Sequence, residues 1–486
     1  MPFFTNGMDQ KLVEKAREFA RKVHEGQKRQ SGEPYFAHLE ATAKTLAELG
    51  MSAPTIVAGY LHDAIEDVGV SAEEIEKEFG PDVRFIVEGV TKLGHLKYRG
   101  ADRHNESLRK LFVAMSQDIR VLIVKLCDRL HNMETLSFVP KEKQGRIAGE
   151  TLEIYAPIAY RLGIRKLSKR LEDLAFQYLM PAEYKEITEL LKAKRESESD
   201  SLEKFKREVT KELAKDGVKN FKTDFRIKGT YSLYKKYLRC NKDIDKIYDI
   251  AAMRVLVGTS EDCYRVLGII HSHWQPLPGK IKDFIAHPKQ NGYQGLHTTV
   301  FTGLGTVVEV QIKTEEMQRE AEYGIASHIA YKAGAGLKNS SMEWIRKILP
   351  SFISKNTEAK ESASQDIPKW IRELVNYQNT HHDTDELLDD IKSDFLNTRI
   401  FVFTPRGDVV DLPSGSSVVD FAYSIHSDIG NTMSGAKING KMSSLGTVLQ
   451  NGDIVEIITK KSSKPSRKWL EYAKTTFAKK HIKQLT

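Results

Sequence analysis

The chain changes its hydrophobic period near residue 224, and this change limits the folds open to it. From about residue 10 to 196, apolar residues recur at helical spacing, as in PTIVAGYLHDAIEDV and DIRVLIVKLCDRLHNMETL. From about 224 to 310, two β-branched runs, DIAAMRVLVG and TVVEVQIKT, flank one helical stretch, EDCYRVLGIIHSHW. The sequence therefore predicts a multidomain protein with an all-helical domain followed by an α/β domain.

A third compact unit is predicted near the C-terminus. Residues 398–460 give two strands joined by a turn around Pro405–Gly407, a short helix capped by Ser416 or Ser417, a hairpin signal at Asn439-Gly440 and a closing strand. This order is typical of a small β-grasp fold.

These patterns divide the chain into five expected parts. We expect a helical domain at 1–197, an α/β domain at 198–340, a linker with helical segments at 341–397, the β-grasp unit at 398–460, and the start of a further helical region at 461–486. The helical ending suggests a longer protein. Residues 188–217 are so polar that a solvated connector is the default interpretation, with a packed helix as the alternative.

Composition excludes several classes. The net charge of +8 is compatible with nucleotide or RNA binding but is equally typical of a surface that only aids solubility. The three cysteines form no CxxC pair, which argues against a disulfide framework or a cysteine zinc site. Neither a signal peptide nor a run of about 18 apolar residues is present, so we expect no membrane span and a cytoplasmic location.

The helical domain contains a candidate metal site made of His38, the pair His62-Asp63, and Asp128. Two imidazoles and two carboxylates can hold one divalent ion and leave positions open for water and phosphate. A single histidine in a helical domain is usually a surface or satisfied core residue. Four such groups in apolar helices favour a metal, because burying them without a cation is costly.

The surrounding spacing adds further candidates. Glu66 and Asp67 each follow a proposed ligand by four residues, so on a helix they lie one turn away on the same face. Such carboxylates could accept a proton from water. Asn132 and Thr135 lie four and seven residues after Asp128, where they could bind a substrate beside the metal.

This pattern resembles the H…HD…D signature of HD-superfamily phosphohydrolases. The wider segments RQSGEPYFAH, GYLHDAIEDV, VTKL and VKLCDRLHNMETL resemble the hydrolase domain of long RelA/SpoT homologue proteins. The resemblance implies a Mn²⁺ site that removes the 3′-pyrophosphate from (p)ppGpp, with ligands His38, His62, Asp63 and Asp128. It also implies that Glu66 and Asp67 position or activate water, and that the nucleotide is contacted by Arg29, Ser31, Asn132 and Thr135. Leu39 and Cys127 depart from the common family residues, but neither is a proposed ligand.

The α/β domain contains a second cluster of candidate residues. Arg226 and Lys228 would share one face of a strand, and Ser232 and Lys236 one face of the helix after it, which suits a triphosphate. A basic solvated edge is the alternative for this segment alone. Asp249 and Glu309, from two strands, could hold one Mg²⁺, and a carboxylate there could act as a general base. The same region supplies Lys282, Lys289, Tyr293, His297 and Gln311.

Residues 225–334, with NGYQGLHTTV, EVQIKT and EYGIASHIAYK, resemble the synthetase domain of the same family. The resemblance implies transfer of pyrophosphate from ATP to the 3′-oxygen of GDP or GTP. It implies that Tyr293 stacks on guanine, Arg226 holds adenine, Glu309 is the base and His297 stabilises the transferring group. The remaining implied contacts are ATP phosphates for Lys228, Ser232 and Lys236, Mg²⁺ for Asp249 and Glu309, and substrate for Lys282 and Gln311.

The β-grasp unit resembles a TGS domain. In the long synthetases this region senses the 3′ end of uncharged tRNA at the ribosome, and His426 matches the histidine that contacts tRNA. An ordinary role at a helix end is the alternative for His426.

Three functions remain open at this point. A bifunctional enzyme with oppositely coupled sites is the leading hypothesis. The second is a Mn²⁺-dependent hydrolase whose α/β domain only senses nucleotides, and the third is chiefly an RNA- or ribosome-binding regulator.

Overall fold

The computed structural model describes residues 7–94, 118–247, 250–288, 293–303, 306–324, 326 and 399–486 without 451 and 461. The chain forms two compact units, residues 1–371 and 372–486, which are described separately. The predicted linker at 341–397 lies outside the described residues. Within the described part of the chain, no helix is both long and apolar enough to cross a membrane.

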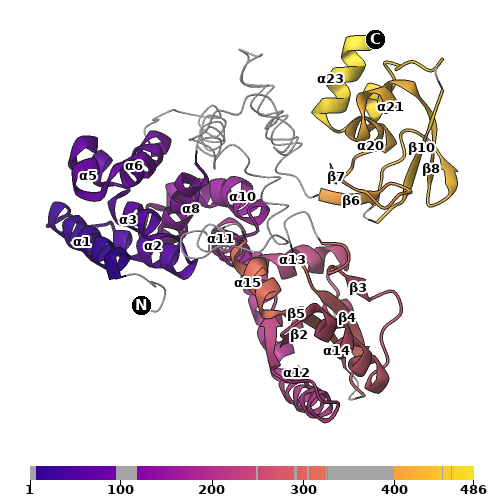
Figure 1. The fold of residues 1–486 in the computed structure, drawn as a ribbon, viewed down its shortest axis with the longest axis horizontal. Coiled ribbons are helices and arrows are strands. Elements are labelled where there is room, and N and C mark those ends of the chain that lie inside the picture. The colour runs from indigo at the N-terminus through magenta and orange to yellow at the C-terminus, as the bar shows by residue number, and fades with distance from the viewer. Residues whose placement is uncertain are drawn as a thin grey trace. The chain divides into compact units, whose positions relative to one another are not determined.

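The first unit begins with a helical domain, drawn from indigo to magenta in Figure 1. Its helices are α1 (Gly7–Val23), α2 (Phe36–Glu48), α3 (Ala53–Leu61), α4 (Ala64–Val68), α5 (Ala72–Phe79), α6 (Pro81–Gly94), α8 (Ile119–Glu134), η1 (Leu136–Phe138), α9 (Lys141–Glu150), the π-helical turn η2 (Thr151–Tyr155), α10 (Ala156–Arg161) and α11 (Arg165–Leu179). Helix α3 packs against α1, α2, α6 and α8. All eight residues from Thr55 onward to His62 are buried, so α3 forms the centre of the domain.

Helix α12 (Pro181–Lys215) has 35 residues and continues through the boundary predicted at 197/198. The default interpretation of its polar stretch as a solvated connector was wrong. Phe205, Val209 and Leu213 are fully buried because their spacing of four residues places them on one face of the helix. The average polarity of the stretch concealed this narrow apolar stripe.

The α/β part contains one mixed five-stranded sheet in the order β1-β2-β5-β4-β3. Its elements are β1 (Lys222–Ile227), α13 (Thr230–Arg239), η3 (Ile244–Lys246), β2 (Ala251–Val257), α14 (Ser260–His273), β3 (Lys282–Asp283), β4 (Leu296–Phe301), β5 (Val307–Thr314) and α15 (Glu315–Tyr323). Strands β2 and β5 are parallel, and the other neighbours are antiparallel.

The two faces of this sheet differ in character. One face packs on α14 and on the C-terminal part of α12, in a core that includes Val255, Val310 and Cys263. Side chains alternate between the faces of a strand, so the polar residues of β1, β2 and β5 lie together on the other face. Helix α11 contacts α13 and α15. The helical domain therefore packs against the α/β part on the side where these polar residues lie.

The second unit has a two-stranded sheet, β6 (Arg399–Phe403) with β7 (Val409–Pro413), and a three-stranded sheet in the order β10-β8-β9. The remaining elements are α20 (Val418–Ile425), α21 (Ser427–Thr432), β8 (Met433–Ile438), β9 (Lys441–Ser443), β10 (Val455–Thr459), α22 (Trp469–Tyr472) and α23 (Thr476–Leu485). The predicted hairpin is confirmed, since Ile438 pairs with Lys441 and both Asn439 and Gly440 have positive φ.

The segment after residue 460 belongs to the core of this unit. Trp469 and Ile482 are buried in one cluster with residues of α20. The buried Asp420 carboxylate accepts hydrogen bonds from the Ser417, Lys474 and Thr475 amides, which joins the C-terminal helices to α20.

Candidate active site

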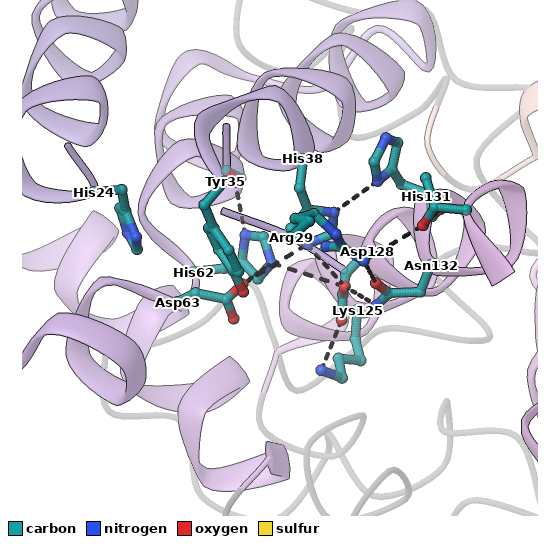
Figure 2. Close-up of polar contacts among 12 residues, drawn as sticks. His24, Arg29, Tyr35, His38, His62, Asp63, Lys125, Asp128, His131 and Asn132 are labelled. Carbon is teal, nitrogen blue, oxygen red and sulfur yellow. Dashed lines mark hydrogen bonds and ion pairs between the residues drawn. The ribbon is translucent and has the colours of Figure 1, made fainter. Parts of the chain in front are cut away.

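The four predicted metal ligands meet at one buried place between helices α2, α3 and α8 (Figure 2). His38 Nε2 lies 3.3 Å from Asp128 Oδ1 and 3.7 Å from Asp63 Oδ2. His62 Nε2 lies 3.1 Å from Asp63 Oδ2 and 3.9 Å from Asp128 Oδ1. The structure thus brings these side chains together, and their role as ligands stays a prediction.

A close approach of α2 and α3 brings the two histidines together. A Cβ atom on Gly59 would lie 2.5 Å from Leu46 Cδ1 and 3.3 Å from Ala43 Cα. A larger residue here, three residues before His62, would have to displace the Leu46 side chain and press on the backbone of α2. His38 lies on the buried face of α2 with Leu39, Thr42 and Ala43.

The chemistry of the donor set fits a divalent cation. His62 Nδ1 lies 2.9 Å from the Gly59 carbonyl oxygen, which can only accept, so Nδ1 carries the proton. The neutral ring then directs the lone pair of Nε2 at the two carboxylates, and this buried atom has no hydrogen-bond partner among the described residues. A cation between Nε2 and the carboxylates would satisfy all three groups.

In the absence of a cation, a proton would take its place. Burial alone would lower the pKa of His62, but Asp63 and Asp128 outweigh it and raise this pKa to about 9. Burial also opposes ionisation of Asp128, yet Lys125 and the two histidines hold the pKa of this carboxyl well below its usual range. The pocket is therefore built to keep both carboxylates ionised beside positive charge.

Three of the four predicted substrate contacts also come together. Arg29 Nη2 donates to Asn132 Oδ1 at 2.6 Å and to Thr135 Oγ1 at 3.4 Å. Asn132 Nδ2 donates in turn to Asp128 Oδ1 at 2.5 Å. Ser31 lies in the same turn as Arg29, where its hydroxyl donates to Glu33.

Glu66 and Asp67 are exposed residues of α4, the short helix that begins after Asp63. Burial, Asp63 and Asp67 together raise the pKa of Tyr35 far above its usual value, which places Asp67 beside this ring. Both carboxylates are thus open to water, and Asp67 is the one that lies beside a residue of the cluster.

Sequence reasoning missed three neighbours of this site, all labelled in Figure 2. Tyr35 OH donates to Asp63 Oδ2 at 2.7 Å, and Lys125 Nζ lies 2.7 Å from Asp128 Oδ2. His131 Nδ1 lies 2.8 Å from His38 Nδ1. Each of the three is three residues from a predicted ligand, so helical spacing contained a signal for all of them.

The second candidate site lies on the polar face of the mixed sheet. The strand register places Arg226, Ala252 and Glu309 in one row across β1, β2 and β5. His297 and Gln311 lie in the next row. Gln311 Nε2 donates to Glu309 Oε1 at 2.7 Å, and His297 Nδ1 lies 3.4 Å from the same oxygen. Two predicted catalytic residues, Glu309 and His297, are therefore neighbours.

A pocket opens over this face. Its walls come from both the helical domain and the α/β part, and its lining residues are Tyr160, Arg165, Ser168, Lys169, Glu172, Arg226, Lys228, Gly229, Ser232, Ala252, Glu309 and Gln311. Four of these are cations and two are carboxylates, which suits a ligand that carries several phosphates. The contribution of α10 and α11 to this pocket was not predicted.

Tyr293 is placed differently from the sequence expectation. The resemblance implied a ring that stacks on guanine, but the residue is only 3 % exposed. The Arg165 guanidinium lies 4.7 Å from the ring centroid, and Lys313 Nζ lies at the same distance. Tyr293 OH is 2.5 Å from His297 Nε2. Stacking on a base therefore requires Arg165 or Lys313 to move.

Lys282 is an exposed residue of β3 that pairs in register with His297. Lys236 lies one turn after Ser232 on α13. Asp249 and Lys289 lie outside the described residues.

Lys313 is a buried cation at the edge of this site and is only 2 % exposed. Burial and the nearby Arg226, Arg254 and Arg165 lower its pKa to about 7. Folding thus forces a lysine that is charged in the unfolded chain into surroundings that oppose its charge.

The replacement Lys313→Met is expected to stabilise the free protein by roughly 1–4 kcal/mol near neutral pH. In the wild type, the unfolded state binds a proton that the folded state lacks between pH ~7 and ~10.5, so stability rises with pH across this window. The variant should lose this rise. Urea unfolding at several pH values measures both effects, and Lys222→Met, at an exposed position of β1, is the matched control. A variant that is less stable than the wild type at neutral pH would contradict the prediction.

In the second unit, His426 is the N-cap residue of helix α21, and its Nδ1 accepts a hydrogen bond from the Asp428 amide at 3.2 Å. The side chain is 62 % exposed. The residue therefore has a structural role as a cap, and its ring is also open to a partner.

Three family models match the chain. An HD domain matches residues 16–165, a region found in RelA / SpoT proteins matches 225–336, and a TGS domain matches 400–459. These matches confirm the predicted fold class of a helical HD-type domain, an α/β synthetase-type domain and a TGS domain. An HD-type hydrolase domain implies a divalent metal, and His38, His62 and Asp128 each offer a ligand atom within 4.8 Å of the others.

The chain is similar over almost its full length to curated bacterial proteins. It is 41 % identical over 483 residues to a guanosine-3′,5′-bis(diphosphate) 3′-pyrophosphohydrolase of Borreliella burgdorferi, which covers 99 % of this chain and 68 % of the relative. It is 41 % identical over 467 residues to the bifunctional (p)ppGpp synthase/hydrolase SpoT of Escherichia coli, covering 96 % of this chain and 63 % of that protein. A probable 3′-pyrophosphohydrolase of Synechocystis is 42 % identical, and the chain spans 59 % of its length. On this similarity, the chain belongs to the RelA/SpoT family.

Proposed function

We propose that this chain both makes and breaks guanosine 3′-pyrophosphates, at two separate sites. The observation that carries the proposal is that both sets of residues occur in one chain, with His38, His62, Asp63 and Asp128 close together in one domain and Glu309, His297 and Gln311 close together in the other. One relative is named a GTP pyrophosphokinase and another is named a 3′-pyrophosphohydrolase, and each is 43 % identical to this chain.

The hydrolytic reaction belongs to the helical domain. His38, His62, Asp63 and Asp128 would hold Mn²⁺, which supplies charge to neutralise the 3′-pyrophosphate and to make water more acidic. Asp63 is oriented by Tyr35, and Asp128 by Lys125 and Asn132. Glu66 and Asp67 would accept the proton of the attacking water from the solvent side. Arg29, Ser31 and Thr135 would contact the nucleotide, which leaves as GDP or GTP.

The synthetic reaction belongs to the pocket on the sheet. Glu309 would remove the proton from the 3′-hydroxyl of GDP or GTP, and it would hold Mg²⁺ together with Asp249. The 3′-oxygen then attacks the β-phosphorus of ATP, the bond to the α-phosphate oxygen breaks, and AMP leaves. The phosphates of ATP would be bound by Lys228, Ser232, Lys236 and Lys282. His297 and Gln311 would position Glu309 and the transferring group.

The two sites are proposed to be regulated in opposite directions, because simultaneous activity would waste ATP. Helix α11 contacts α8 and α9 of the helical domain and also α13 and α15. Its first residue, Arg165, covers Tyr293, the residue proposed to stack on guanine. This arrangement supports a state in which synthesis is disfavoured. Full rates of both reactions, unchanged by nucleotide at the other site, would defeat the coupling.

The paired assay of the wild type is the primary test. Incubation with ATP, GDP and Mg²⁺ should yield AMP and ppGpp, and incubation of ppGpp with Mn²⁺ should yield GDP and pyrophosphate. Hydrolysis without any synthesis would favour a hydrolase with a sensor-only α/β domain. Steeply salt-dependent RNA binding without either reaction would favour a regulator that works in the cytoplasm on uncharged tRNA and the ribosome, through His426 and the TGS domain.

Metal binding is expected to stabilise the helical domain. A ligand that binds only the folded state at 100 times its Kd adds about 2.7 kcal/mol, so Mn²⁺ added to chelator-treated protein should raise Tm. The His62→Ala variant should show no such rise, because it lacks a central donor. A thermal scan with Mn²⁺ and with Mg²⁺ also compares the two ions. An equal rise of Tm for His62→Ala and the wild type would contradict the proposed ligand set.

A further inference from the structure

Helix α13 begins without a cap of its own. Its N-cap residue is Gly229, which has an extended backbone and no side chain to accept from the first turn. The first N–H groups of a helix need an acceptor from elsewhere. This turn matters for the proposed function, because Lys228 precedes it and Ser232 lies within it, and both line the pocket.

The missing cap comes from the helical domain. Asp173, on α11, accepts a hydrogen bond at Oδ1 from the Tyr231 amide and another from the Thr230 hydroxyl, both at 3.0 Å. Tyr231 is the second residue of α13, and its amide is one that an N-cap side chain normally binds. The negative charge of Asp173 also faces the positive end of the helix dipole.

The local sequence is shaped for this contact. A Cβ atom on Gly229 would lie 2.9 Å from both carboxylate oxygens of Asp173 and 2.9 Å from Lys169 Cε. A larger residue at this position would push the Asp173 carboxylate away from the start of α13. Lys169, one turn earlier on α11, donates from Nζ to the Ile227 carbonyl oxygen at the end of β1 at 2.9 Å. Helix α11 therefore holds the segment 227–231 at both ends.

We infer that Asp173 is a positioning residue for ATP. It fixes the start of α13 and so places Lys228, the Gly229 backbone and Ser232 against the triphosphate. This inference rests on the proposed synthetic reaction. It also makes ATP binding depend on the docking of α11, although Asp173 itself does not touch the nucleotide.

The test compares Asp173→Ala with Asp173→Asn in the full chain. Alanine removes the acceptor that caps α13. We expect the KM for ATP, and the Kd for ATP measured by calorimetry, each to rise about five- to tenfold, which is the size of effect expected from the loss of one helix cap. The KM for GDP and the rate of ppGpp hydrolysis should stay within about twofold of the wild type. Asparagine keeps a carbonyl acceptor at the same place, so it should restore most of the ATP affinity.

The matched control is Lys235→Gln, which removes another contact between α13 and α11, the ion pair of Lys235 with Glu172 at 3.0 Å, but leaves the cap intact. It should leave the KM for ATP unchanged. Unchanged or tighter ATP binding in Asp173→Ala overturns the inference. An equal rise in the KM for ATP and for GDP in all three variants would also overturn the inference, because this result would show a general loosening of the contact between α11 and α13. A wild type that neither binds ATP nor makes ppGpp would instead overturn the proposed function.

Discussion

The Asp63→Ala variant is expected to lose hydrolysis of ppGpp by roughly 10³-fold or more, while synthesis continues. Asp63 Oδ2 is the oxygen nearest to His62 Nε2 and also lies 3.7 Å from His38 Nε2. Alanine removes that charge from the centre of the cluster and leaves the Tyr35 hydroxyl without its acceptor. The measurement is release of pyrophosphate from ppGpp at saturating Mn²⁺, beside synthesis by the same preparation.

Glu78→Ala is the control for this experiment, since it removes an exposed carboxylate of the same domain whose ion pair with Lys15 contributes little. It should retain both activities. Hydrolysis by Asp63→Ala at a rate near that of the wild type would remove the basis for a metal site at this place.

The Glu309→Gln variant is expected to show the reverse pattern, a loss of synthesis of roughly 10³-fold or more with hydrolysis retained. Glutamine preserves the size of the side chain and can still meet Gln311, but it cannot take a proton from the 3′-hydroxyl or hold Mg²⁺ as a carboxylate does. His297, 3.4 Å from Glu309, would then face a neutral amide. The readout is AMP formed from ATP in the presence of GDP.

Glu315→Gln makes the same chemical change just after β5, at an exposed position paired with Lys222, and should leave synthesis unchanged. Substantial synthesis by Glu309→Gln would assign the role of base to another residue. Because each variant is tested for the reaction that it should spare, misfolding and loss of chemistry are distinguishable.

The residues of the hydrolytic site were predictable because they lie on helices. Helical spacing fixes which side chains share a face, and it predicted Glu66 and Asp67 beside His62 and Asp63, and Asn132 and Thr135 beside Asp128. The same rule contained Tyr35, Lys125 and His131, but three-residue spacing is common. The contact of Tyr35 with Asp63 and that of His131 with His38 became evident only from the packing of the helices.

The synthetic site was less predictable, because two domains build it. Nothing near Tyr293 in the sequence indicates that Arg165 covers its ring. Asp173 and Tyr231 are 58 residues apart and meet only because α11 docks on α13. Long-range contacts of this kind depend on how surfaces fit, and local patterns of polarity do not encode them.

Helix α12 has a consequence for how this protein can be divided. Its first half supplies Ile187 to the small core around Leu233 and Tyr237, and its second half supplies Phe205 to the core under the sheet. A fragment that begins at residue 198 would therefore expose an unfilled apolar cleft beside α13, whereas one that begins at 181 carries the whole helix. Because the same small core also takes Phe176 from α11, the smallest autonomously folding synthetic module should start with α11, well before the strands that bear its chemistry.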